Sequence, residues 1–260
     1  MGSIDAPEAR NRLLSWEGCH NVRDLGGLET AAGGRTRHGT VVRADNVRRL
    51  SSVGWRSMLD HGIRRVVDLR FEGEEADEPG VPDDIEVIGV SLFGRHDPKK
   101  EREFDERIRY ADDVAAVFAS GYIRTLERSP ARVTSAVAAV VDGNEADGVL
   151  IHCFAGKDRT GIVTALLLGA VGVPDEIIAA DYAESEQNME SLFRTWVSEA
   201  ADPAERELRR RIIRAPYATM LAVLQWLHIE AGGPARYLSD AGLAADQLVR
   251  LRRRLLADPR

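Results

Sequence analysis

The stretch from Gly148 to Pro174 constrains the fold of this chain more than any other part of it. Gly148-Val149-Leu150-Ile151-His152 is a short apolar run of strand length,. After a loop of a few residues, the segment 160–171 is apolar on every side and is followed by Gly172 and Pro174, which end helices,. A helix without a polar face is buried. The sequence therefore predicts a strand, a tight loop and a central helix.

The remaining patterns place this unit in an α/β fold. Strands are predicted at 40–43, 63–70 and 85–92, and Ala32-Gly33-Gly34 is typical of a hairpin turn,. Helical spacing appears at 53–61 and over 111–141, with a break near Ser129-Pro130 and a charged lead-in at 94–109,. Further helices are expected at 175–183, 185–200, 204–213, 217–230, 235–241 and 245–256,. Strands that alternate with helices, followed by a helix-rich second half, indicate an α/β sandwich around a short, mostly parallel sheet.

Composition limits the class of protein. With 260 residues, 44% hydrophobic and 30% charged, the chain can bury a core as one domain over 1–260, with a monomer as the default,. Cys19 and Cys153 are its two cysteines, which are too few for a disulfide framework, and no cysteine–histidine cluster has metal-ligand spacing,. We therefore expect no metal, no cofactor and a reducing compartment.

The net charge and the apolar content of two segments limit which partners and which location we expect. A net charge of −7 argues against generic nucleic-acid binding, which depends on clustered cations,. The segment Met1–Ala6 has no basic region followed by an apolar run, and the apolar stretch 162–173 is too short to cross a bilayer,. A cytoplasmic protein without an integral membrane segment is expected, and export without a classical signal stays open.

The loop between the strand and the helix carries the chemistry. A cysteine is a nucleophile as its thiolate, and an ordinary thiol with a pKa of about 8.5 is mostly protonated at neutral pH. A loop that leads into a helix N-terminus directs free N–H groups and the positive end of the helix dipole at one point, which suits both a thiolate and a phosphoryl group. Gly156 permits close backbone approach, and Arg159, six positions after Cys153, can close the ring with two parallel donors,.

These residues predict a two-step phosphatase reaction. Cys153 attacks phosphorus to give a cysteinyl-phosphate, and water then hydrolyses it without a metal. Thr160 can donate its hydroxyl to the sulfur as it leaves, and Asp158 is the nearest acid for the leaving oxygen,. The alternative is a buried core cysteine followed by a solvated turn. The catalytic interpretation requires a thiol that solvent can reach and a guanidinium that faces it.

Two related loops are excluded by the sequence. A nucleotide-binding Walker loop requires glycine and serine or threonine at places occupied by Ile151 and Asp158,. A sulfurtransferase loop has one residue fewer between cysteine and arginine.

The loop His152-Cys153-Phe154-Ala155-Gly156-Lys157-Asp158-Arg159-Thr160 resembles the signature of the protein tyrosine phosphatase superfamily. HCFAGKDRTG, NVRDLGG near the N-terminus and VVDLR at 66–70 are more narrowly similar to an atypical bacterial branch. The resemblance implies a phosphatase-type three-layer sandwich and a helical lid around 174–216. It also implies hydrolysis of phosphotyrosine, with phosphoserine, phosphothreonine and phosphoinositides as further substrates for members with lysine after the loop glycine.

The resemblance assigns roles by position. Cys153 is the nucleophile, Arg159 binds phosphate, and Phe154, Ala155, Gly156, Lys157 and Thr160 line the substrate site with Asp68. Classical members carry their acid on a Trp-Pro-Asp loop that this chain lacks, so Asp158 and Asp68 compete for that role. The alternative for Asp68 is a structural ion pair with Arg70. Arg23 and Asp24 either shape the entrance to the site or pair with each other.

Two further roles and two rival functions remain open. His152 is predicted to order the loop by hydrogen bonds, and Lys157 to add a second cation beside the clamp. The rival enzyme is a phosphoinositide or inositol-phosphate phosphatase. The rival outside enzymes is a phosphate-binding pseudophosphatase.

Overall fold

A computed structural model describes residues 12–74 and 80–257, so the predictions for Met1–Ala6 lie outside the described residues. Its sheet has the order β1-β2-β5-β3-β4. The strands are β1 (Arg23–Asp24), β2 (Val41–Ala44), β3 (Ile63–Asp68), β4 (Glu86–Gly89) and β5 (Gly148–His152). β2, β5, β3 and β4 run parallel, and β1 pairs antiparallel with β2. The short, mostly parallel sheet is confirmed.

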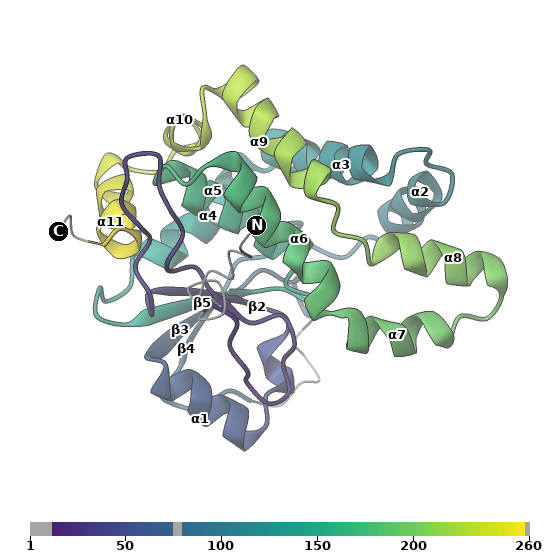
Figure 1. Ribbon diagram of the computed structural model, residues 1–260, viewed down its shortest axis with the longest axis horizontal. Helices are drawn as coiled ribbons and strands as arrows, with labels where there is room; N and C mark the ends of the chain where they lie inside the picture. Colours follow the sequence, from purple (N-terminus) through teal and green to yellow (C-terminus); the bar gives the residue numbers. More distant parts are fainter. Residues whose placement is uncertain (1–11, 75–79, 258–260) are drawn as a thin grey trace, which may run out of the picture.

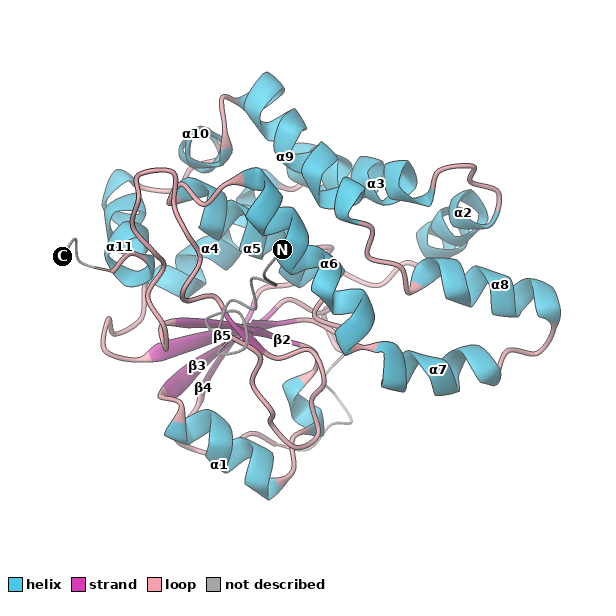
Figure 2. Cartoon of the chain, viewed as in Figure 1, coloured by secondary structure: helices cyan, strands magenta, loops and turns pink. Residues whose placement is uncertain are grey.

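Helices cover both faces of the sheet (Figures 1 and 2). α1 (Ser52–Asp60) lies on one face, with the short 3-10 helix Val47–Arg49 nearby in the chain. α4 (Pro130–Val141) and α5 (Asp158–Ala170) lie on the other. Around α5 are α3 (Val114–Arg128), α6 (Asp175–Asn188), α9 (Tyr217–Ala231), α10 (Pro234–Asp240) and α11 (Ala245–Leu255). The three-layer α/β sandwich follows from this arrangement.

Side chains of β5 alternate between the two cores. Leu150 packs with Val42, Val66 and Met58 on the α1 side, whereas Val149 and Ile151 join the larger core around α5. This alternation is the period of a strand buried on both faces. The residues Ile162–Leu168 of α5 are all buried, as an all-apolar helix requires,. The central strand–loop–helix unit is confirmed.

Most predicted elements exist, with small shifts at their ends. The turn at 32–34 closes with Gly33 N–H donating to the Thr30 carbonyl at 2.9 Å, and the break at Ser129-Pro130 separates α3 from α4. The strand expected at 85–92 is shorter, and the helix expected at 185–200 is wrong at its start because α6 runs on to Asn188.

The charged segment 94–109 contains a helix that the sequence analysis did not predict. α2 (Pro98–Arg109) starts at Asp97, whose carboxylate accepts from Lys99 N–H at 3.0 Å and Lys100 N–H at 3.4 Å. Its mixed charges hide the weak apolar stripe, in which Ile108 is the buried residue. An N-cap aspartate before Pro98 was the available signal.

Two helices form a hairpin at one end of the molecule, α7 (Glu190–Ser198) and α8 (Pro203–Ile212), and α8 lies beside α2 (Figure 1). α7 has no buried residue, and α8 buries Leu208. α6, in contrast, contributes Ile178, Ala179 and Tyr182 to the large core. Within the predicted lid at 174–216, the hairpin α7–α8 is therefore the part that packs least against the core. That this hairpin acts as a lid stays a prediction. Among the described helices, none combines the length and apolarity needed to cross a membrane.

Candidate active site

The cysteine loop follows β5 at the carboxyl edge of the parallel strands. His152 of β5 is in register with Ala44 of β2 and Asp68 of β3. The residue after each strand therefore lies near the start of the loop, where sites of α/β folds assemble. The loop then enters α5 at Asp158. The predicted placement of Cys153 at this edge is confirmed.

Gly156 is required by the path of the loop. Its φ is +66°, in the left-handed region, and a Cβ there would come within 2.4 Å of the Ala44 carbonyl oxygen. A side chain would clash with β2 in addition to straining the backbone. This close approach brings the loop down onto the end of β2.

The carbonyl groups of residues 153–156 each accept from a donor outside these four residues. The Cys153 carbonyl lies 3.1 Å from Nδ1 of His152, which must carry the proton because a carbonyl only accepts,. The next three carbonyls accept from Asn46 N–H at 3.0 Å, Asn21 Nδ2 at 2.9 Å and Arg43 Nη2 at 2.6 Å, in chain order Phe154, Ala155, Gly156. The predicted ordering role of His152 matches this contact.

Cys153 is more buried than the catalytic interpretation of the sequence requires. Its exposed fraction is 2%, so the expectation of a solvent-accessible thiol is wrong for this conformation. The cause is the position of the residue on the floor of the loop, packed with the large core. Its neighbour Phe154 is 46% exposed and stacks on Arg49 with the guanidinium carbon 4.9 Å from the ring centre.

The Arg159 guanidinium is held by groups that the sequence analysis did not single out. Nη1 pairs with Glu74 Oε2 at 3.2 Å, and the guanidinium carbon lies 4.8 Å from the ring centre of Phe71 and 5.8 Å from that of Phe93. Among the described residues, the ion pair with Glu74 is the one that Arg159 makes. Closure of the ring around phosphate by Arg159 stays a prediction.

Lys157 does not offer its charge as expected. Nζ donates to the carbonyls of Ile212 at 2.7 Å and Arg214 at 3.0 Å, and it lies 3.4 Å from Oδ1 of Asp158. It also sits over the Phe118 ring. Because an ammonium has three N–H donors, these acceptors fill them, and the lysine joins the loop to the end of α8. Its role as a free second cation is therefore not supported by this geometry.

Asp158 faces a pair of buried tyrosines. The Tyr122 hydroxyl of α3 donates to Asp158 Oδ1 and lies 2.9 Å from the Tyr182 hydroxyl of α6. Burial, with the nearby Asp158 charge, raises the pKa of both tyrosines well above the ordinary value, so they remain neutral donors,. About a third of the Asp158 side chain is exposed.

Asp68 lies on the other flank of the loop and is fully engaged. Arg70 donates Nε to Oδ1 at 3.0 Å and Nη2 to Oδ2 at 2.7 Å. Burial opposes ionisation, yet the hydrogen bonds from Arg70 and the nearby His152 hold the pKa of Asp68 below its ordinary value. Burial lowers the pKa of His152, whose Nε2 lies 3.6 Å from Asp68 Oδ2. The interpretation of Asp68 as the partner of Arg70 is confirmed.

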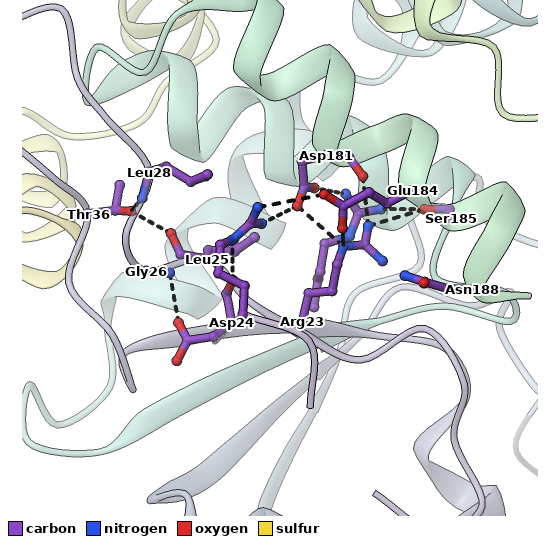
Figure 3. Close-up of polar contacts among 12 residues, drawn as sticks. Arg23, Asp24, Leu25, Gly26, Leu28, Thr36, Asp181, Glu184, Ser185 and Asn188 are labelled. Atoms are coloured by element: carbon purple, nitrogen blue, oxygen red, sulfur yellow. Dashed lines mark hydrogen bonds and ion pairs between the residues drawn. The ribbon is translucent and has the colours of Figure 1, made fainter. Parts of the chain in front are cut away.

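A buried ionic cluster lies behind the loop (Figure 3). Asp181 of α6 accepts from the guanidinium groups of Arg12, Arg23 and Arg43. Asp24 points the other way from Arg23 and accepts from the N–H groups of Gly26 at 2.7 Å and Gly39 at 2.8 Å. The expected Arg23–Asp24 pair does not form, because adjacent strand residues face opposite sides of a sheet. Neither residue is among the contacts of the loop.

The remaining predicted site residues stand where the loop places them. Ala155 is nearly buried, and Thr160 is fully buried in the first turn of α5. Within the described residues the Thr160 hydroxyl has no hydrogen-bond partner, so its predicted donation to the Cys153 sulfur is not made in this structure and stays a prediction. Four residues of the site escaped prediction: Asn21, Arg43, Glu74 and Tyr122. NVRDLGG marked the first, and nothing in the spacing marked the others.

Comparison with known proteins agrees with this geometry. A model of the tyrosine phosphatase family matches residues 14–257. The triple specificity protein phosphatase PtpB of Mycobacterium tuberculosis is 30% identical over 281 aligned positions, which cover 92% of this chain and 97% of that protein. A tyrosine-protein phosphatase of Nostoc commune is 29% identical over 226 positions, 82% of this chain and 73% of that protein.

Proposed function

The chain belongs to the tyrosine phosphatase family and is a protein-tyrosine phosphatase, and from that premise we propose that it acts without a metal through a cysteinyl-phosphate on Cys153. The observation that carries the proposal is the loop at the N-terminus of α5, whose carbonyls are all bonded outward. Inward N–H groups and a helix dipole stabilise a thiolate and a phosphoryl group alike.

In the first step, the Cys153 thiolate attacks phosphorus while the bond to the leaving oxygen breaks. Arg159 donates to two phosphoryl oxygens, and Asp158 gives its proton to the leaving oxygen. In the second step, water attacks phosphorus, Asp158 takes the proton from that water, and the P–S bond breaks with Thr160 donating to the sulfur. Each bond that forms is matched by one that breaks, and no further reactant is needed.

Asp158 is favoured over Asp68 as the acid. A proton donor must reach the substrate, and the Asp158 side chain is partly exposed, whereas Asp68 is bound by Arg70 through both oxygens. A carboxylate with a lowered pKa holds its proton poorly,. The Tyr122 hydroxyl donates to Oδ1 of Asp158, and Lys157 Nζ lies 3.4 Å from the same oxygen, so two groups fix the orientation of this carboxylate.

For the substrate we favour phosphotyrosine in proteins, with phosphoserine and phosphothreonine as further substrates. Phe154, Phe71 and Phe93 supply aromatic surface beside the clamp for an aryl ring. Phosphoinositide hydrolysis is less favoured, because the Lys157 ammonium donates its hydrogen bonds to carbonyl groups at the end of α8. Catalytic efficiencies on a panel of phosphopeptides and phosphoinositides measure this preference.

The decisive variant is Cys153→Ser, compared with Cys19→Ser as the matched control. We expect Cys153→Ser to abolish hydrolysis of an aryl phosphate in EDTA while it still binds inorganic phosphate, and Cys19→Ser to act like the wild type. Cys19 lies apart from the loop, with its thiol donating to the Asn46 carbonyl at 3.4 Å. Wild-type turnover by Cys153→Ser would refute the mechanism. Phosphate binding by a wild-type protein that shows no turnover would support the pseudophosphatase instead.

A further inference from the structure

The phosphate loop is anchored by donors that come from outside it. In a trans peptide, the C=O of one residue and the N–H of the next point in opposite directions. The donors that hold the carbonyls of residues 153–156 outward therefore turn the N–H groups of residues 154–157 inward. Two of these donors are side chains from distant parts of the chain, Asn21 and Arg43.

Arg43 links the loop to the buried cluster. Its Nη1 donates to Asp181 Oδ2, while Nη2 donates to the Gly156 carbonyl at 2.6 Å. About 1% of its side chain is exposed, so neither bond competes with water. The planar guanidinium can make both contacts at once because its nitrogens diverge in fixed directions.

Asn21 makes a parallel connection. Its Nδ2 donates to the Ala155 carbonyl at 2.9 Å, and its Oδ1 accepts from Arg23 Nη1. Arg23 in turn donates to Asp181. Both loop contacts are thus connected, through Arg43 directly and through Asn21 and Arg23, to the carboxylate of Asp181 in α6.

Charge in the cluster favours an anion in the loop. Although burial opposes ionisation, Arg23, Arg43 and Arg12 hold the pKa of Asp181 far below its ordinary value. Burial lowers the pKa of Arg23 to about 10, which keeps it charged at neutral pH. Three guanidiniums face Asp181 and the half-exposed Glu184, which leaves one positive charge in excess behind the loop. A buried charge of this kind is little screened by salt.

We infer that Asn21 and Arg43 are positioning residues of this phosphatase, which aim the loop amides at the phosphoryl group, and that Asp181 holds Arg43 in place. The inference rests on the proposed function of the loop. Neither side chain contacts the substrate. Substituting either one should therefore weaken both anion binding and thiolate stabilisation, although Cys153, Arg159 and Asp158 are all still present.

The test uses Arg43→Gln, with Ser185→Ala as the matched control. Ser185 Oγ accepts from Arg23 at 3.3 Å and Arg43 at 3.5 Å and does not contact the loop. Two quantities are measured: the inhibition constant of inorganic phosphate and the rate at which iodoacetamide alkylates Cys153 at pH 6. We expect Arg43→Gln to weaken phosphate about tenfold, the value of one charge-assisted hydrogen bond, and to slow alkylation similarly. Ser185→Ala should change neither by more than about twofold.

Asn21→Asp provides the second variant if Arg43→Gln does not fold. It keeps the oxygen that accepts from Arg23 and replaces the donor to Ala155 by an acceptor, so we expect the same two losses. Unchanged phosphate inhibition and alkylation in a folded variant, or equal losses in Ser185→Ala, would overturn the inference. A wild type whose Cys153 is neither alkylated at pH 6 nor protected by phosphate would instead count against the proposed function.

Discussion

The two flanks of the phosphate loop each carry one carboxylate, and the carboxylates have opposite surroundings. Asp68, at the end of β3, is bound through both oxygens by Arg70 and lies near His152. Asp158, at the start of α5, accepts from the neutral Tyr122 hydroxyl, lies 3.4 Å from Lys157 Nζ and is partly exposed, without the two-oxygen guanidinium pair that Asp68 has. The two aspartates thus differ in their partners and in their exposure to solvent, although each is a candidate for the proton donor.

From this difference we propose a structural role for Asp68 and proton transfer for Asp158. Removing a buried carboxylate that pairs with a guanidinium lowers the stability of the fold, because the guanidinium is then buried without an opposite charge. A carboxylate held by a hydroxyl keeps its shape and orientation while its protonation can change. The variants below test this division, beginning with the largest expected effect.

Asp68→Asn should lower the free energy of unfolding by about 3 kcal/mol, because the buried Arg70 loses its carboxylate. Urea unfolding followed by circular dichroism measures this. The folded fraction should retain the ratio of rates on good and poor leaving groups. A stable variant with a changed leaving-group ratio would move the acid to β3.

Asp158→Asn should slow substrates with poor leaving groups about a hundredfold, because an alkoxide then leaves without a proton. Activated aryl phosphates, whose leaving groups need little help, should slow much less. The measurement is kcat/KM across a series of aryl and alkyl phosphates. Equal slowing across the series would return the role to Asp68 or to water.

Tyr122→Phe should reduce turnover of poor leaving groups about tenfold, the value of one hydrogen bond to a charged group. The ring remains, so packing against Tyr182 and Phe118 is retained. Tyr237→Phe is the matched control, since its hydroxyl donates to the Leu126 carbonyl of the same helix at 2.8 Å, away from the loop. Similar losses in the two variants would indicate general destabilisation of α3 rather than positioning of Asp158.

The smallest expected effect is the loss, in acid, of the stability that Asp68 contributes to the folded state. Because the pKa of Asp68 lies below its ordinary value of 3.8 when folded, its contribution to stability is present above about pH 4 and is lost as the pH falls through the lowered value,. The wild type should therefore lose more stability between pH 6 and pH 3 than Asp68→Asn. Parallel loss in the two proteins would remove this role from Asp68.

The sequence allowed the central unit and the protein family to be predicted, because both depend on neighbours in the chain. The apolar run before Cys153 and the all-apolar segment after Arg159 placed the loop between β5 and α5. The pairing of Asp68 with Arg70 was also readable at a separation of two residues.

What escaped prediction depends on contacts between distant segments. Asp181 meets Arg12, Arg23 and Arg43 across more than 130 residues, and no local pattern in α6 distinguishes a buried carboxylate from an exposed one. The depth of Cys153 and the engagement of Lys157 depend in the same way on how the core and the end of α8 close around the loop. Helix α2 was missed for a local reason, since its charges masked a proper N-cap.

The most direct test of the account traps the phosphoryl group during turnover. Asp158→Asn lacks the base of the second step, so rapid acid quenching after mixing with an activated aryl phosphate should accumulate the intermediate. Peptide mass spectrometry is predicted to find phosphate on the peptide that contains Cys153 and none on the peptide that contains Cys19. Phosphate on a different residue, or turnover with no phosphorylated cysteine at any time point, would contradict it.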